Sequence, residues 1–116
     1  MKYFFSLRIE AQLEQVPKIT NILGIEPNYP QVAWGYKLVI KENTYTNFID
    51  YFLGILEGKY DKLRKIGITK EEISIWMIYE YDEQCNMEFA PSDMKKLGDS
   101  GISFCVSCYN AANAEK

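Results

Sequence analysis

Residues 72–82 constrain the fold most, because they form the most β-prone segment of the chain. One face of this segment carries Ile73, Ile75, Met77, Tyr79 and Tyr81. The opposite face carries Ser74, Trp76, Ile78, Glu80 and Asp82. A period of two predicts a β-strand. Trp76 and Ile78 make the second face partly apolar, which favours a central strand covered on more than one side.

Three other segments alternate in the same way and are predicted to be strands: residues 2–10, 34–41 and 102–109. Residues 86–90 could form a further short strand after a turn at 82–86. This short strand would make a hairpin with residues 72–82.

Helical spacing of apolar residues predicts three helices between these strands, over residues 14–23, 48–66 and 91–97. The second helix is expected to break near Gly58, because glycine weakens a helix interior by about 1 kcal/mol relative to alanine. In the third helix, Met94 and Leu97 are expected to face inward, and Gly98 to Gly101 should turn the chain.

These segments predict the element order β-α-β-α-β-β-α-β in one α+β domain over residues 1–116, with residues 110–116 as a frayed tail. The chain has 116 residues, enough for a single core, and 47% of them are apolar. The helices are too few to cover both faces of a sheet. We therefore expect a mostly antiparallel sheet with helices mainly on one face.

The stretch Ile19–Pro27 is similar to the opening signature of the bacterial domain-of-unknown-function family 4279, most specifically in its Leu-Gly-Ile-Glu-Pro part. The first strand around residues 5–9, Trp34 beyond the loop, and the late pattern from Ile73 to Phe104 extend the resemblance over nearly the whole chain. The resemblance implies a fold of the kind predicted above and no particular reaction. By analogy, small domains of this general kind are often immunity proteins beside bacterial toxins.

Catalytic chemistry finds little support in the residue types. The chain has no histidine, so it lacks the commonest general base near neutral pH and the commonest transition-metal ligand. No glycine-rich phosphate loop occurs either. We predict no catalytic residues, no cofactor and no metal site, and we favour a protein that is not an enzyme.

The three cysteines also suggest no site. Cys105 and Cys108 have the spacing of a redox pair, but on a strand this spacing puts the two sulfurs on opposite faces, with Cys108 in the core and Cys105 away from it. An odd number of cysteines without a secretory signal predicts a cytoplasmic location.

The net charge is −3 and no basic patch stands out, which argues against a nucleic-acid partner. No apolar run approaches the roughly 20 residues needed to cross a bilayer, so no membrane partner is expected.

Two hypotheses about function follow. The outward faces of the strands still contain large or apolar side chains: Phe4, Val39, Trp76, Ile78, Cys105 and Tyr109. If the strands are neighbours, these residues form a surface that binds a protein partner or a second copy of the chain. The alternative is that the long helix covers this face, or that the inward and outward residues of one strand are assigned the wrong way round. The leading hypothesis is therefore a protein-binding module, with a toxin-neutralising immunity protein as its particular case.

The alternative is a pocket for a small ligand or a divalent metal ion, built from aromatic and acidic side chains. Its residues would be Trp34 and Tyr36 together with Glu80 and Asp82. Across both hypotheses, the candidate binding residues are Trp34, Tyr36, Trp76, Ile78, Glu80 and Asp82.

Overall fold

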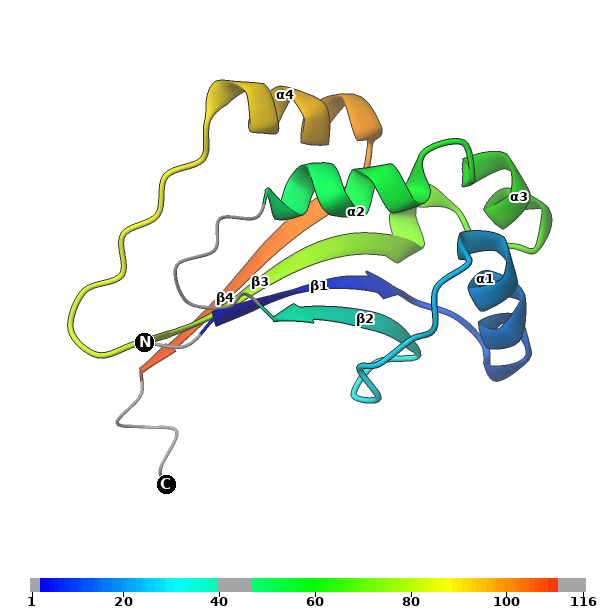
Figure 1. Ribbon diagram of the computed structural model, residues 1–116, viewed down its shortest axis with the longest axis horizontal. Coiled ribbons are helices and arrows are strands. Elements are labelled where there is room, and N and C mark those ends of the chain that lie inside the picture. Colours follow the sequence, from blue (N-terminus) through cyan, green and yellow to red (C-terminus); the bar gives the residue numbers. More distant parts are fainter. Residues whose placement is uncertain (1–2, 40–46, 111–116) are drawn as a thin grey trace.

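The computed structural model describes residues 3–39 and 47–110, which contain one four-stranded sheet (Figure 1). Its strands are β1 (Tyr3–Ile9), β2 (Trp34–Val39), β3 (Ile73–Tyr81) and β4 (Ser103–Asn110), in the spatial order β2-β1-β3-β4. β1 pairs antiparallel with both β2 and β3, whereas β4 lies parallel to β3. The predicted α+β class with a mostly antiparallel sheet is confirmed.

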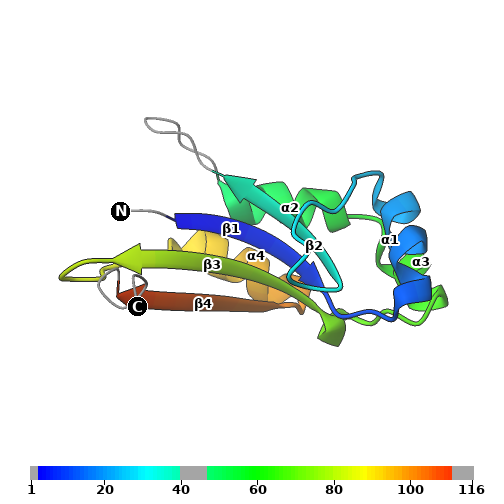
Figure 2. The ribbon, with the colours of Figure 1, turned by 90° about the horizontal axis from the view of Figure 1, so that it is seen from below.

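The helices lie on one side of this sheet or at one end of it (Figures 1 and 2). Their bounds are α1 (Val16–Leu23), α2 (Phe48–Leu56), α3 (Tyr60–Lys65) and α4 (Pro91–Ser100). Short 3-10 turns at Leu13–Gln15 and Lys70–Glu72 precede α1 and β3. α2 and α4 cover one face, and α1 and α3 gather at one end of the sheet, as expected for helices mainly on one face.

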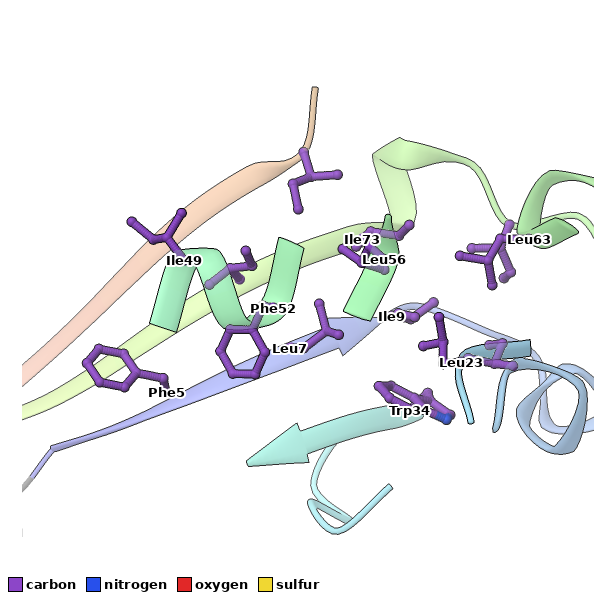
Figure 3. Close-up of a cluster of buried hydrophobic side chains, with 14 of the residues drawn as sticks. Phe5, Leu7, Ile9, Leu23, Trp34, Ile49, Phe52, Leu56, Leu63 and Ile73 are labelled. Carbon is purple, nitrogen blue, oxygen red and sulfur yellow. The ribbon is translucent and has the colours of Figure 1, made fainter. Parts of the chain in front are cut away.

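The hydrophobic core fills the space between α2 and the sheet (Figure 3). Alternation along β1 directs Phe5, Leu7 and Ile9 into it, and all three are at most 5% exposed. Phe5 stacks on Phe48 of α2 with ring centroids 3.8 Å apart. The predicted inward positions of the first strand therefore meet the predicted apolar stripe of the second helix.

The helical pattern over residues 48–66 is interrupted as the sequence predicted. Gly58 adopts φ 75°, a left-handed conformation that glycine tolerates best, and it separates α2 from α3. Leu56 before the break and Leu63 after it are both fully buried. Because of the break, α2 packs over the sheet and α3 packs at the end of the sheet, although one apolar pattern runs through both helices.

The prediction of a hairpin after β3 is wrong. Residues 86–90 form no strand, and the chain instead passes through α4 before it returns as β4. The physical reason is that both edges of β3 are already hydrogen-bonded, one to β1 and the other to β4. Phe89 packs its ring against Phe104 of β4, with centroids 5.1 Å apart.

Two expectations about the C-terminal third also need correction. α4 continues through Gly98 to Ser100, so the turn is made later, and Met94 is 54% exposed although Leu97 is buried as expected. Asn110 is the last residue of β4 and does not belong to a frayed tail. Residues 111–116 of that predicted tail lie outside the described residues.

Within the two described ranges, no helix has both the length and the apolar character needed to span a membrane.

Candidate functional site

The most distinctive surface of the protein is the face of the sheet opposite α2 and α4, termed here the uncovered face (Figure 2). Strand alternation places on it the side chains of Phe4, Ser6, Arg8, Lys37, Ser74, Trp76, Ile78, Glu80, Ser103, Cys105, Ser107 and Tyr109. Val39 belongs to the same set by register, but its side chain lies outside the described part of the chain.

β3 is a central strand, as predicted. The expectation that it is covered on more than one side is wrong for the described residues, because α2 and α4 both lie on the other face (Figures 1 and 2). Antiparallel sheets commonly leave one face to solvent, but such a face is usually polar. Here the two central strands carry Phe4, Trp76 and Ile78 on it, each only partly buried. The packing of the described residues therefore does not explain why apolar side chains lie on the uncovered face.

Strand register brings these residues into contact distance. Phe4 is paired with Ile78 across β1 and β3, and Ser6 is paired with Trp76. On the far side of β3, Trp76 is paired with Cys105 of β4. Directly paired residues on one face have Cβ atoms only about 5 Å apart, so these side chains form one continuous surface.

Arg8 is the central cation of the uncovered face. Its guanidinium carbon lies 4.2 Å from the ring centroid of Trp76 and 5.2 Å from that of Tyr29. Its Nε donates a 3.0 Å hydrogen bond to Oγ of Ser6, which is fully buried. Two cation–π contacts and a directed hydrogen bond together position the guanidinium over the sheet.

The Trp76 ring is also fixed from its own strand. Its Nε1 donates a 2.8 Å hydrogen bond to Oγ of Ser74, two residues earlier on the same face. The polar edge of the indole is thereby satisfied, while its ring face is used by Arg8.

A second cation lies beside the first. Nζ of Lys37 on β2 is 4.2 Å from the ring centroid of Phe4, and Phe4 in turn lies 5.8 Å from the ring of Tyr29. Cations and aromatic rings therefore form one continuous series of contacts, in the order Lys37, Phe4, Tyr29, Arg8 and Trp76.

The loop before β2 contributes Tyr29, and its position depends on two neighbours. The side chain of Asn28 donates to the carbonyl of Lys37 at 3.2 Å and accepts from its amide, which ties the loop to the edge strand. Gly35 allows the close approach, because a Cβ at this position would lie 2.4 Å from Cγ2 of Val32. The backbone amides of Asn28 and Tyr29 both donate to the carbonyl of Gly35.

The charges of Arg8 and Lys37 have no carboxylate partner among the described residues. The ion pairs formed there join Arg64 to Asp61, Lys95 to Asp99 and Lys96 to Asp50. The chain has a net charge of −3. Its described part nevertheless places two cations without a carboxylate partner on an aromatic surface. Such a surface suits a partner that offers carboxylates beside apolar groups.

The aromatic and acidic residues proposed for a pocket do not come together. Trp34 is fully buried in the core, and its Nε1 donates a 3.1 Å hydrogen bond to Oγ1 of Thr20. Tyr36 stacks on Tyr51, and the hydrogen bond between them, followed by burial, raises the pKa of Tyr51. Both side chains lie on the helix-covered face.

Glu80 lies on the uncovered face beside Tyr109, its partner in register, and Asp82 is exposed in the bend after β3. The sheet itself therefore separates Glu80 from Trp34 and Tyr36, and Asp82 lies beyond the end of β3. Within the described residues, no three side chains of His, Cys, Asp or Glu lie close enough together to hold a metal ion.

Trp76 and Ile78 are the two predicted binding residues that the structure places together on the uncovered face, with Glu80 nearer its end. The sequence analysis missed Arg8, Lys37 and Tyr29. The positions of Arg8 and Lys37 could have been found, because alternation in β1 and β2 puts them on the same face as Phe4. Tyr29 lies in a loop, where no periodicity indicates direction.

The prediction for the cysteines is confirmed in one respect and wrong in another. Cys105 and Cys108 lie on opposite faces of β4, as their pairing with Trp76 and Tyr79 shows. Cys108 is nevertheless exposed, so it is not a core residue. The reason is that β4 is an edge strand, flanked by the sheet on one side only.

No family model matches the chain, and searches of curated proteins and of solved structures find no match. The resemblance to family 4279 therefore stays a prediction.

Proposed function

We propose that the protein is a non-catalytic protein-binding module that uses the uncovered face of its sheet. The observation that supports this proposal is the series of aromatic rings and cations from Lys37 to Trp76 on a face that no described helix covers. Tryptophan and arginine are enriched at positions that dominate binding energy in protein interfaces. Their fixed geometry here lowers the entropy that a partner must overcome.

The two cations that lack a carboxylate partner among the described residues indicate the kind of partner. Arg8 and Lys37 favour a protein surface with Asp or Glu side chains around an apolar centre that covers Trp76 and Ile78. Cations held on aromatic rings keep part of their hydration, so they can bind carboxylates without complete desolvation. Binding should therefore weaken as salt concentration rises.

The proposal is tested by capturing a stoichiometric partner from an extract of the source cells and measuring its affinity for variants. Arg8→Glu is expected to raise the Kd by about tenfold or more, as for a hot-spot arginine. The matched control is Lys62→Glu, which makes the same charge change at an exposed position on α3. Equal affinity of both variants for the partner would contradict the proposal.

Self-association is the competing use of the same surface. Light scattering over a concentration series gives the mass of the protein alone. A monomer that binds a partner supports the proposal. A stable dimer that Arg8→Glu and Trp76→Ala both dissociate would assign the uncovered face to a second copy of the chain instead.

A toxin-neutralising immunity protein is the particular case that we favour. Its support is the analogy with other small domains of this kind and a chain that offers no histidine for acid–base chemistry. The test is growth of cells that express the product of a neighbouring gene, with and without this protein. Rescue by the natural chain but not by Arg8→Glu would support this case, and toxicity that is unchanged by either would contradict it.

A further inference from the structure

We propose that Cys85 and Cys108 are a redox-active thiol pair that forms a reversible intramolecular disulfide. The two Sγ atoms lie 3.4 Å apart, although the residues are 23 positions apart in the sequence. Both are free thiols in this structure. This inference concerns a different part of the molecule from the uncovered face and does not depend on the proposed function.

The fold explains how the pair is brought together. Cys85 lies in the connection that follows β3, and Cys108 lies near the end of β4 (Figure 1). Because β3 and β4 are parallel, their C-terminal ends meet at the same end of the sheet. Cys108 is paired in register with Tyr79, so the connection after β3 passes directly beside it.

Geometry limits the chemistry to these two sulfurs. Two thiols at 3.4 Å are in hydrogen-bond contact, and only a small local shift separates them from the bonded distance of about 2 Å. Cys105 lies on the uncovered face, opposite Cys108 across the strand. The pair in the sequence motif Cys105–Cys108 is therefore separated by the sheet, and the partner of Cys108 comes from a distant loop.

The exposures of the two residues indicate the order of reaction. Cys108 is exposed, whereas Cys85 is half-buried. Burial, followed by the hydrogen bond with Cys108, raises the pKa of the Cys85 thiol. Cys108 is therefore the thiol that meets a reagent from solution, and Cys85 is the resolving thiol.

The oxidant is a low-molecular-weight disulfide such as oxidised glutathione. The Cys108 thiolate attacks one sulfur of this disulfide, forms a mixed disulfide and releases one small thiolate. The Cys85 thiolate then attacks Sγ of Cys108 and displaces the second small thiolate. Two electrons pass from the protein to the small disulfide, and the two protons go to the two small thiols released.

The product would close a ring that contains α4 and most of β4. The crossover from β3 through α4 to β4 would then be held at both ends. Restricting the unfolded chain by a loop of this size should raise the melting temperature by about 10 °C.

The test equilibrates the full chain with defined ratios of reduced and oxidised glutathione, followed by alkylation and mass spectrometry. The expected product has lost two hydrogen atoms and retains one thiol that can be alkylated. Trypsin cleaves at Lys95 and Lys96, so a disulfide would join the peptide with Cys85 to the peptide with Cys105 and Cys108. Because the second peptide contains two cysteines, the matched control Cys105→Ser shows which of them is bonded. It should give the same disulfide-linked product.

Cys85→Ser and Cys108→Ser should each lose the intramolecular product and the rise in melting temperature. They should instead keep glutathione as a mixed disulfide on the remaining cysteines. Loss of the product in Cys105→Ser would overturn the proposal. So would a natural chain in which Cys108 stays glutathionylated and the disulfide with Cys85 never forms.

Discussion

The two faces of this sheet are built from the same strands and yet are stabilised in different ways. Phe4 and Phe5 are neighbours in the sequence, but Phe5 is 5% exposed beneath α2, whereas Phe4 is only partly buried on the uncovered face. On the covered face, aliphatic and aromatic side chains pack against helices. On the uncovered face, the rings of Phe4 and Trp76 are packed against cationic side chains and one loop.

The two kinds of packing differ in how much they stabilise the fold and in how much surface they leave accessible. A closed hydrophobic core contributes to stability in proportion to the apolar area that it removes from water. Arginine and lysine laid on aromatic rings add less stability and leave charge and ring surface accessible to a partner. The covered face therefore accounts for folding, and the uncovered face carries the features from which we infer binding.

The largest expected effect comes from the adjacent phenylalanines. Phe5→Ala should lower the free energy of unfolding by about 3–5 kcal/mol, because it leaves a cavity opposite Phe48. Phe4→Ala should cost about 1 kcal/mol, because its site is open to water. Urea unfolding followed by circular dichroism measures both. Equal losses would remove the distinction between the faces, and Phe5→Leu provides a folded reference if Phe5→Ala does not fold.

An intermediate effect is expected at the loop that flanks the uncovered face. Gly35→Ala would place a methyl group against Val32 and the backbone of Tyr29, so the loop must move. The cost should be about 1–3 kcal/mol, as for other insertions into a packed site. Gly54→Ala is the matched control, since a Cβ there meets no atom within 4 Å. An unchanged stability of Gly35→Ala would show that the loop is not held against the strand.

A smaller effect is expected for the contact between Arg8 and Trp76. A double-mutant cycle with Arg8→Ala and Trp76→Ala should give a coupling free energy of about 0.5–1 kcal/mol, typical of partly exposed cation–π pairs. The measurement is again urea unfolding, of the two single variants and the double variant. Strictly additive losses would show that the guanidinium does not hold the indole.

The smallest expected effect lies outside both faces, at the exposed turn before β3. The side-chain hydroxyl and the amide of Thr69 donate to the Glu72 carboxylate, and the bond from the hydroxyl is the main cause of its lowered pKa. A lowered folded-state pKa means stability that is present above the unfolded value, about 4.5, and is lost as pH falls. Thr69→Ala should reduce the loss in free energy of unfolding between neutral pH and pH 3, as measured by unfolding experiments at several pH values. An unchanged pH dependence would contradict this assignment.

Alternation and helical spacing were sufficient to predict the four strands, because period-two patterns are set by the local geometry of the backbone. The same reasoning located the break at Gly58. It failed for residues 86–90, because whether a short segment pairs depends on which strand edges are free. Both edges of β3 are taken by β1 and β4, which are distant in the sequence.

The sequence by itself determined the class of fold, which residues of each strand share a face, and the aromatic character of the outward ones. Only the tertiary structure decided the strand order, the side on which the helices lie, and the partners of Arg8 and Cys108. The physical reason is that these contacts join residues far apart in the chain. Tyr29 reaches Arg8 through a loop without periodicity, and Cys85 reaches Cys108 only because β3 and β4 run parallel.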